Sequence, residues 1–142
     1  MADKRPVLSQ LNLVVNDVNA SATFYRHLGV EFDDAGSEHR NAVDCGALHF
    51  DLDSRSFARV WNSGAASERP AVVIGFDVAS RAEVDRLYDE LTSAGYRGQQ
   101  RPYDAFFGAR YAVVEDPDGN PVGLMSPIDP ERRTWPPKPA PS

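Results

Sequence analysis

The chain has 142 residues, a formal net charge of -6 and a hydrophobic fraction of 42%, which together predict one globular domain with its own core. The acidic balance disfavours nucleic acid and anionic lipid as partners, because both need clustered Lys and Arg. Cys45 is the only cysteine, so an intrachain disulfide is impossible. No apolar run could span a membrane, and the amino terminus shows no secretory pattern. We therefore expect a cytoplasmic protein whose partner is a small molecule or another protein.

The first half of the chain predicts four strands and two helices. Alternating and β-branched residues indicate strands at residues 8–15, 30–32, 41–45 and 47–52. Asp17 is suited to cap a helix, and Gly29 is suited to end it. The apolar positions of that helix recur at helical spacing: Val18, Ala22, Tyr25 and Leu28. A short helix is expected at residues 54–62, with Phe57, Val60 and Trp61 on one side.

The second half repeats this order after a polar link at residues 63–70. Strands are expected at residues 71–78, 97–103, 109–115 and 121–125, with a turn at residues 116–120. Ser80 and Glu83 have the spacing of a capping box, and Gly95 ends the helix that they start. The apolar face of that helix consists of Val84, Leu87, Tyr88, Leu91 and Ala94.

These elements predict an α+β fold of two βαβββ modules. Its divisions are an extension at 1–6, one domain at 7–127 (modules 7–62 and 71–127, linker 63–70) and a tail at 128–142. The tail is rich in proline, so from residue 129 onward we expect it to be extended and mostly disordered. No glycine loop follows the first strand of either module, which argues against a dinucleotide-binding fold.

Four segments resemble the vicinal-oxygen-chelate superfamily, the glyoxalase, bleomycin-resistance and extradiol-dioxygenase proteins. They are residues 11–17 (LNLVVND), 24–29 (FYRHLG), 107–111 (FGARY) and 116–120 (DPDGN). The resemblance extends from about residue 8 to residue 127. It implies that the paired modules form a curled sheet around a cleft, and that the protein is a homodimer.

The resemblance also implies where a metal would be held, on the first strand of each module and on the last strand. In this chain those positions are Gln10, Val73 and Gly123. A divalent cation needs several nitrogen, oxygen or thiolate donors, and Val and Gly side chains offer none. We therefore expect no cofactor. A displaced site that includes His49 and Asp51, two apart on one strand, is the weaker alternative.

The cleft is expected to be largely apolar. If position 10 faces it, strand alternation places Asn12, Val14, Val73, Gly123 and Met125 on the same surface. Aromatic residues are expected at its rim, where flat ligands stack well. The candidates are Trp61, Tyr103, Phe106, Phe107 and Tyr111. Cys45 is expected to be a core residue rather than a nucleophile.

The first hypothesis is a binding protein without an intrinsic metal, which holds a drug-like or aromatic metabolite through Gln10, Asn12 and the rings. Sequestration of an antibiotic, as in bleomycin resistance, is one role that this permits. The alternatives are a glyoxalase-type or dioxygenase-type metalloenzyme with a displaced site, and a metal-free enzyme that uses Asp51 or Glu115 as a base. A third is a regulatory dimer that acts through its proline-rich tail.

Overall fold

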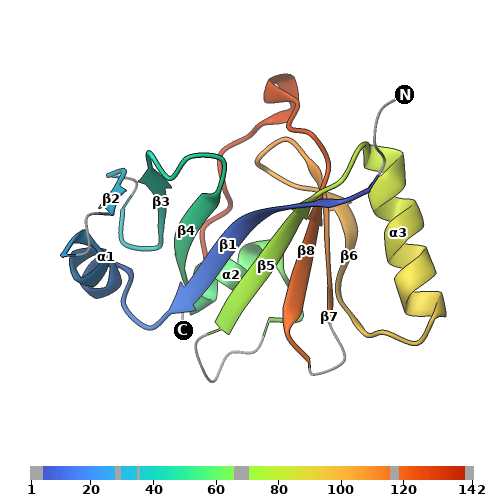
Figure 1. Ribbon diagram of the computed structural model, residues 1–142, viewed down its shortest axis with the longest axis horizontal. Coiled ribbons are helices and arrows are strands. Elements are labelled where there is room, and N and C mark those ends of the chain that lie inside the picture. Colours follow the sequence, from blue (N-terminus) through green and yellow to red (C-terminus); the bar gives the residue numbers. More distant parts are fainter. Residues whose placement is uncertain (1–4, 28–29, 35, 66–70, 116–118, 140–142) are drawn as a thin grey trace.

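The computed structural model describes residues 5–27, 30–34, 36–65, 71–115 and 119–139. One eight-stranded sheet carries the fold, in the order β2-β3-β4-β1-β5-β8-β7-β6, and it curls across the molecule (Figure 1). The elements are β1 (Val7–Val15), α1 (Val18–Arg26), β2 (Glu31–Phe32), β3 (His39–Val43), β4 (His49–Ser54), α2 (Arg55–Trp61), β5 (Ala71–Asp77), α3 (Arg81–Ser93), β6 (Gly98–Asp104), β7 (Arg110–Glu115), β8 (Pro121–Met125) and the 3-10 turn η1 (Pro130–Arg132).

The predicted pair of βαβββ modules is confirmed. β1 pairs with β4 in parallel in the first module, and β5 pairs with β8 in parallel in the second. The two modules join through an antiparallel pairing of β1 with β5, in which Asn12 lies opposite Val73. The curled sheet is therefore complete within one chain.

The two long helices cover one side of the sheet, which we call the outer face. Val18 and Ala22 of α1 pack against Leu52, and Val84 of α3 packs against Leu124. Asp17 and Ser80 cap these helices as expected, by accepting hydrogen bonds from the amides of residues 20 and 83. Leu28 and Gly29, where we expected α1 to end, lie outside the described residues.

The short helix α2 covers the opposite side, which we call the inner face. Ser54 caps it by accepting a hydrogen bond from the Phe57 amide at 3.0 Å. Phe57 and Trp61 are buried as expected, but Ala58 rather than Val60 completes the buried side. They pack against Val14 and Val73 of the central strands.

Two strand boundaries differ from the expectation. The strands expected at residues 41–45 and 47–52 lie at His39–Val43 and His49–Ser54. The connection between them is a turn in which Asp44 and Gly46 have positive φ angles. Residues 44–48 therefore belong to this turn and to neither strand. In the observed register His39 lies opposite Asp53 in the ladder.

The described part of the tail is residues 128–139. It forms the 3-10 turn η1, which Asp129 caps, before it continues in extended form. The amides of Asp129 and Thr134 donate to backbone oxygens of the β6–β7 loop. Trp135 is 93% exposed. Within the described residues, no helix is both long and apolar enough to cross a membrane.

Candidate functional site

A polar cluster lies on the inner face where β1, β3 and β4 run side by side. It consists of Gln10, Asn12, His39, Asp51 and Asp53. The strand periodicity of two places Gln10 and Asn12 on one face of β1, and likewise Asp51 and Asp53 on one face of β4. Asn12 pairs with Asp51 in the parallel ladder. Four of the five side chains therefore follow from strand geometry alone.

Two side-chain amides hold Asp51. Gln10 Nε2 donates to Asp51 Oδ2 at 3.2 Å and to Asn12 Oδ1 at 2.9 Å. Asn12 Nδ2 lies 3.4 Å from a carboxylate oxygen of each aspartate, so it bridges them. Asp51 is only 8% exposed. The structure thus brings together three residues that the sequence marked as candidates, Gln10, Asn12 and Asp51.

Asp53 is the most deeply buried member of the cluster, at 1% exposed. It contacts His39 Nδ1 through one oxygen and accepts a hydrogen bond from Trp61 Nε1 at 3.1 Å through the other. The His39 ring also stacks on Phe57, with ring centroids 4.9 Å apart and planes 14° apart. β4, β3 and α2 are thus tied together at one carboxylate.

Burial changes the acidity of this cluster. Burial, reinforced by the nearby negative charge of Asp53, raises the pKa of Asp51 to about 6. Burial alone would lower the pKa of His39, but its hydrogen bond and charge interaction with Asp53 outweigh that effect, and the pKa is raised. The cluster therefore contains a carboxyl group that titrates close to neutral pH.

An aromatic wall continues the inner face beyond the polar cluster. It consists of Trp61, Tyr103, Phe106, Phe107 and Tyr111, which meet edge to face with ring centroids 5.2–6.5 Å apart. Burial raises the pKa of both tyrosines. The Tyr103 hydroxyl donates to the backbone oxygen of Trp61 at 3.1 Å, which fixes the end of α2.

The remaining members of the predicted ligand set lie in or against this packed core. Val14, Trp61, Val73 and Tyr111 are buried in one hydrophobic cluster, and Met125 packs against it. Phe106 and Phe107, which we expected at a rim, also pack against that cluster and keep partial exposure. Val14 and Val73 therefore lie on one surface, as strand alternation predicted, and α2 packs against it.

The positions that would hold the family's metal do not fit one. Val73 is 2% exposed in the core. A Cβ atom at Gly123 would lie 2.6 Å from the Tyr111 hydroxyl oxygen, so the tyrosine occupies the space of a side chain there. Gln10 alone supplies a donor, and one neutral amide cannot hold a divalent cation.

The displaced site was expected to include His49 and Asp51 of β4. His49 is exposed at the start of β4, while Asp51 is turned into the polar cluster. Among the described residues, no three His, Cys, Asp or Glu side chains converge to hold a metal ion. Glu115, the other candidate base, accepts a hydrogen bond from Gln99 at 3.1 Å and is outside the cluster.

Two depressions in the described structure lie away from the polar cluster. One, of about 620 Å³, lies between the starts of α1 and α2 and includes Glu38 and Arg59. The other, of about 560 Å³, lies between α3 and β6, and Tyr103 is the only member of the aromatic wall that lines it. On the inner face itself, Phe57, Ala58 and Trp61 of α2 pack against Val14 and Val73.

Sequence reasoning missed His39 and Asp53. Asp53 continues the alternation of His49 and Asp51, so the i, i+2, i+4 pattern on one strand was available to find it. His39 lies in a polar stretch outside the strands that we expected at residues 30–32 and 41–45. Only its pairing with β4 identifies it, and no local pattern does.

The family model of the Glyoxalase/Bleomycin resistance protein/Dioxygenase superfamily matches residues 7–124, and the chain belongs to this superfamily. It is 30% identical over 122 residues to the uncharacterized protein YraH of Bacillus subtilis (strain 168), a match that covers 82% of this chain and 95% of YraH.

Solved structures of the superfamily share the fold. The Mn(II)-bound glyoxalase from Novosphingobium aromaticivorans has a TM-score of 0.61 at 19% identity, over 86% of this chain and 40% of the glyoxalase. A variant of homoprotocatechuate 2,3-dioxygenase from B. fuscum has a TM-score of 0.63 at 19% identity, over 89% of this chain and 34% of the dioxygenase. The chain thus spans well under half the length of either enzyme, and these likenesses establish the fold.

Proposed function

We propose that this chain binds a small, partly planar organic molecule on the inner face, where the polar cluster meets the aromatic wall. The burial of Asp51 and Asp53 on that face, at 8% and 1% exposed, carries the proposal. Buried carboxylates cost folding free energy, and an apolar core of the same shape would avoid that cost. Their presence on the inner face favours recognition over packing as their role.

Each part of the inner face contributes a different interaction. Gln10 is partly exposed at the edge of the cluster, so its amide is available to a polar ligand group. Phe106 and Phe107 keep partial exposure and present ring surface for stacking. A mostly apolar surface with a few fixed polar groups is typical of sites for small organic molecules. Sequestration of a drug or an aromatic metabolite is the role that this chemistry supports.

Trp61 provides the test. In a Trp135→Phe background it is the sole tryptophan, and it lies between Asp53 and Tyr111. Titration with a panel of planar organic compounds should change its fluorescence for at least one class. Asp51→Asn should weaken that binding, whereas Asp34→Asn, at a fully exposed side chain, should not. A panel that leaves Trp61 unchanged throughout would refute the proposal.

The pKa of Asp51 favours a second candidate, a metal-free acid–base enzyme. A carboxyl group with a pKa of about 6 can accept and return a proton near neutral pH. If Asp51 acts this way, the rate of the reaction should rise with an inflection near pH 6 and should be lost in Asp51→Asn. Retention of full activity in that variant would exclude this candidate.

A further inference from the structure

The described part of the tail, residues 128–139, runs along the loop that carries the aromatic wall; we call it the C-terminal strap. β8 ends beside this loop, where the amide of Ser126 donates to the backbone oxygen of Arg110 at 3.0 Å. The amide of Asp129 then donates to the oxygen of Gly108 at 2.9 Å, and the amide of Thr134 donates to the oxygen of Phe106 at 2.8 Å. The strap is therefore anchored at successive points along the β6–β7 loop.

The loop and the strap fit closely at Gly108. This glycine has a φ of +92°, which other residues rarely adopt. A Cβ atom there would lie 2.5 Å from the backbone oxygen of Asp129 and 2.8 Å from Cγ of Arg133. The strap thus occupies space that any side chain at this position would need.

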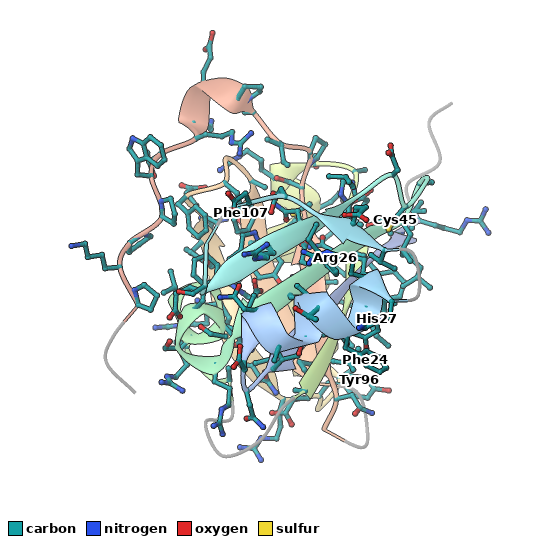
Figure 2. The ribbon with its side chains drawn as sticks, turned by 90° about the vertical axis from the view of Figure 1, so that its left-hand side faces the viewer. Phe24, Arg26, His27, Cys45, Tyr96 and Phe107 are labelled. Atoms are coloured by element: carbon teal, nitrogen blue, oxygen red, sulfur yellow. The ribbon has the colours of Figure 1, made fainter. Side chains whose placement is uncertain are left out.

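The β6–β7 loop connects the strap to α2. The Phe106 ring of the loop meets the Phe57 ring of α2 edge to face, with ring centroids 6.1 Å apart. In Figure 1 the strap passes behind the sheet, and in Figure 2 it runs down the left-hand side of the molecule, outside α2. The strap therefore reaches α2 through the loop that it anchors.

Within the described residues, few polar contacts hold the C-terminal strap. Its prolines at 130, 136, 137 and 139 have no amide to donate. Within the described chain, its backbone hydrogen bonds to the rest of the domain are those of Asp129 and Thr134. Trp135 and Ile128 are 93% and 48% exposed, so they add little burial. A segment held this weakly can detach without global unfolding.

We propose that the C-terminal strap is a removable cover, which holds the β6–β7 loop against α2 and opens the inner face when it detaches. What the opened face admits rests on the proposed function. The opening itself is a property of the fold, and it can be measured without any ligand.

The test uses the full-length chain with Trp135→Phe, so that Trp61 is the sole tryptophan. Thr134→Pro removes the amide that bonds to Phe106. Loss of one backbone hydrogen bond should raise the opening equilibrium, and with it the exchange rate of the Trp61 indole N–H, roughly 2- to 10-fold. Acrylamide quenching of Trp61 should rise in parallel. Lys138→Pro, the same substitution at an exposed strap residue, should leave both unchanged.

Gly108→Ala is the second variant, because its Cβ would displace Asp129 from the loop. Unchanged indole exchange in both Thr134→Pro and Gly108→Ala would overturn the proposal, as would equal effects of Thr134→Pro and Lys138→Pro. If exchange rises but no compound in the panel binds, the cover stands and the proposed function fails. The two ideas are thus separated by one set of proteins.

Discussion

Trp61 on α2 donates its indole N–H to Asp53 on β4 at 3.1 Å, and both side chains are buried. One hydrogen bond thus joins the helix that covers the inner face to the strand that carries both carboxylates. Because an acceptor that loses its donor in a buried site costs free energy, this bond should be visible in the stability of the protein.

Trp61→Phe keeps an aromatic ring but removes the donor. We expect the free energy of unfolding to fall by about 1–3 kcal/mol, from the unsatisfied carboxylate and the lost ring volume. Urea denaturation measures this change. Trp135→Phe, at a 93% exposed residue, is the control and should stay within about 0.5 kcal/mol of the parent. Equal losses in the two variants would contradict the role of the bond.

Asp51 should make stability depend on pH. Its pKa is raised from 3.8 to about 6 in the folded protein, so the folded state holds the proton more tightly than the unfolded state. The contribution of Asp51 is therefore fully present below about pH 4 and is lost as the pH rises through about 6. The pKa difference corresponds to about 3 kcal/mol.

Asp51→Asn removes this titration while keeping the shape of the side chain. The unfolding free energy of the variant minus that of the parent should become more positive, by up to about 3 kcal/mol, between pH 4 and pH 8. Asp34→Asn is the matched control, since the Asp34 side chain is fully exposed. A difference that is flat with pH would show that Asp51 titrates normally.

Tyr111 and Gly123 should behave as a coupled pair. Gly123→Ala places a Cβ atom 2.6 Å from the tyrosine oxygen, so overpacking should destabilise the protein by about 1–3 kcal/mol. In a Tyr111→Phe background the same substitution should cost less, because that oxygen is gone. A double-mutant cycle of unfolding free energies measures the coupling. Additive effects would mean that the space over Gly123 is not filled by Tyr111.

The metal content of the purified protein separates the metal-free binding protein from the metalloenzyme alternative. With the donors that it has, the chain should carry only substoichiometric transition metal when purified without chelator, and EDTA should leave its melting temperature unchanged. Elemental analysis decides this. One equivalent of metal that disappears in His49→Ala would instead support a displaced site, and it would remove the basis for a metal-free binding protein.

We also expect the homodimer that the resemblance implies. Between α1 and α3 the outer face exposes apolar side chains of the central strands, including Leu8 at 58% and Val72 at 46%. Val72→Glu should shift sedimentation toward the monomer, whereas Val43→Glu, at 44% exposed on β3, should not. A parent chain that sediments as a monomer at high concentration would exclude this interface.

Local patterns predicted most of the fold because they act through neighbouring residues. Asp17 and Ser80 cap their helices through amides three residues ahead. The site was only partly predictable, because its members meet through pairing between distant strands. His39 reaches Asp53 only after the turn at Asp44 shifts both strands. The packing of α2 on the inner face was not foreseen, since burial of Phe57 and Trp61 does not reveal which layer they join.

The pairing of β1 with β5 has a genetic consequence. Since each polypeptide supplies both halves of its own inner surface, a copy damaged at Asp51 and another damaged at Tyr111 should not rescue each other when they are produced in the same cell. Proteins that assemble a pocket from two subunits would show such complementation. Here every defective copy should stay defective, whatever it assembles with.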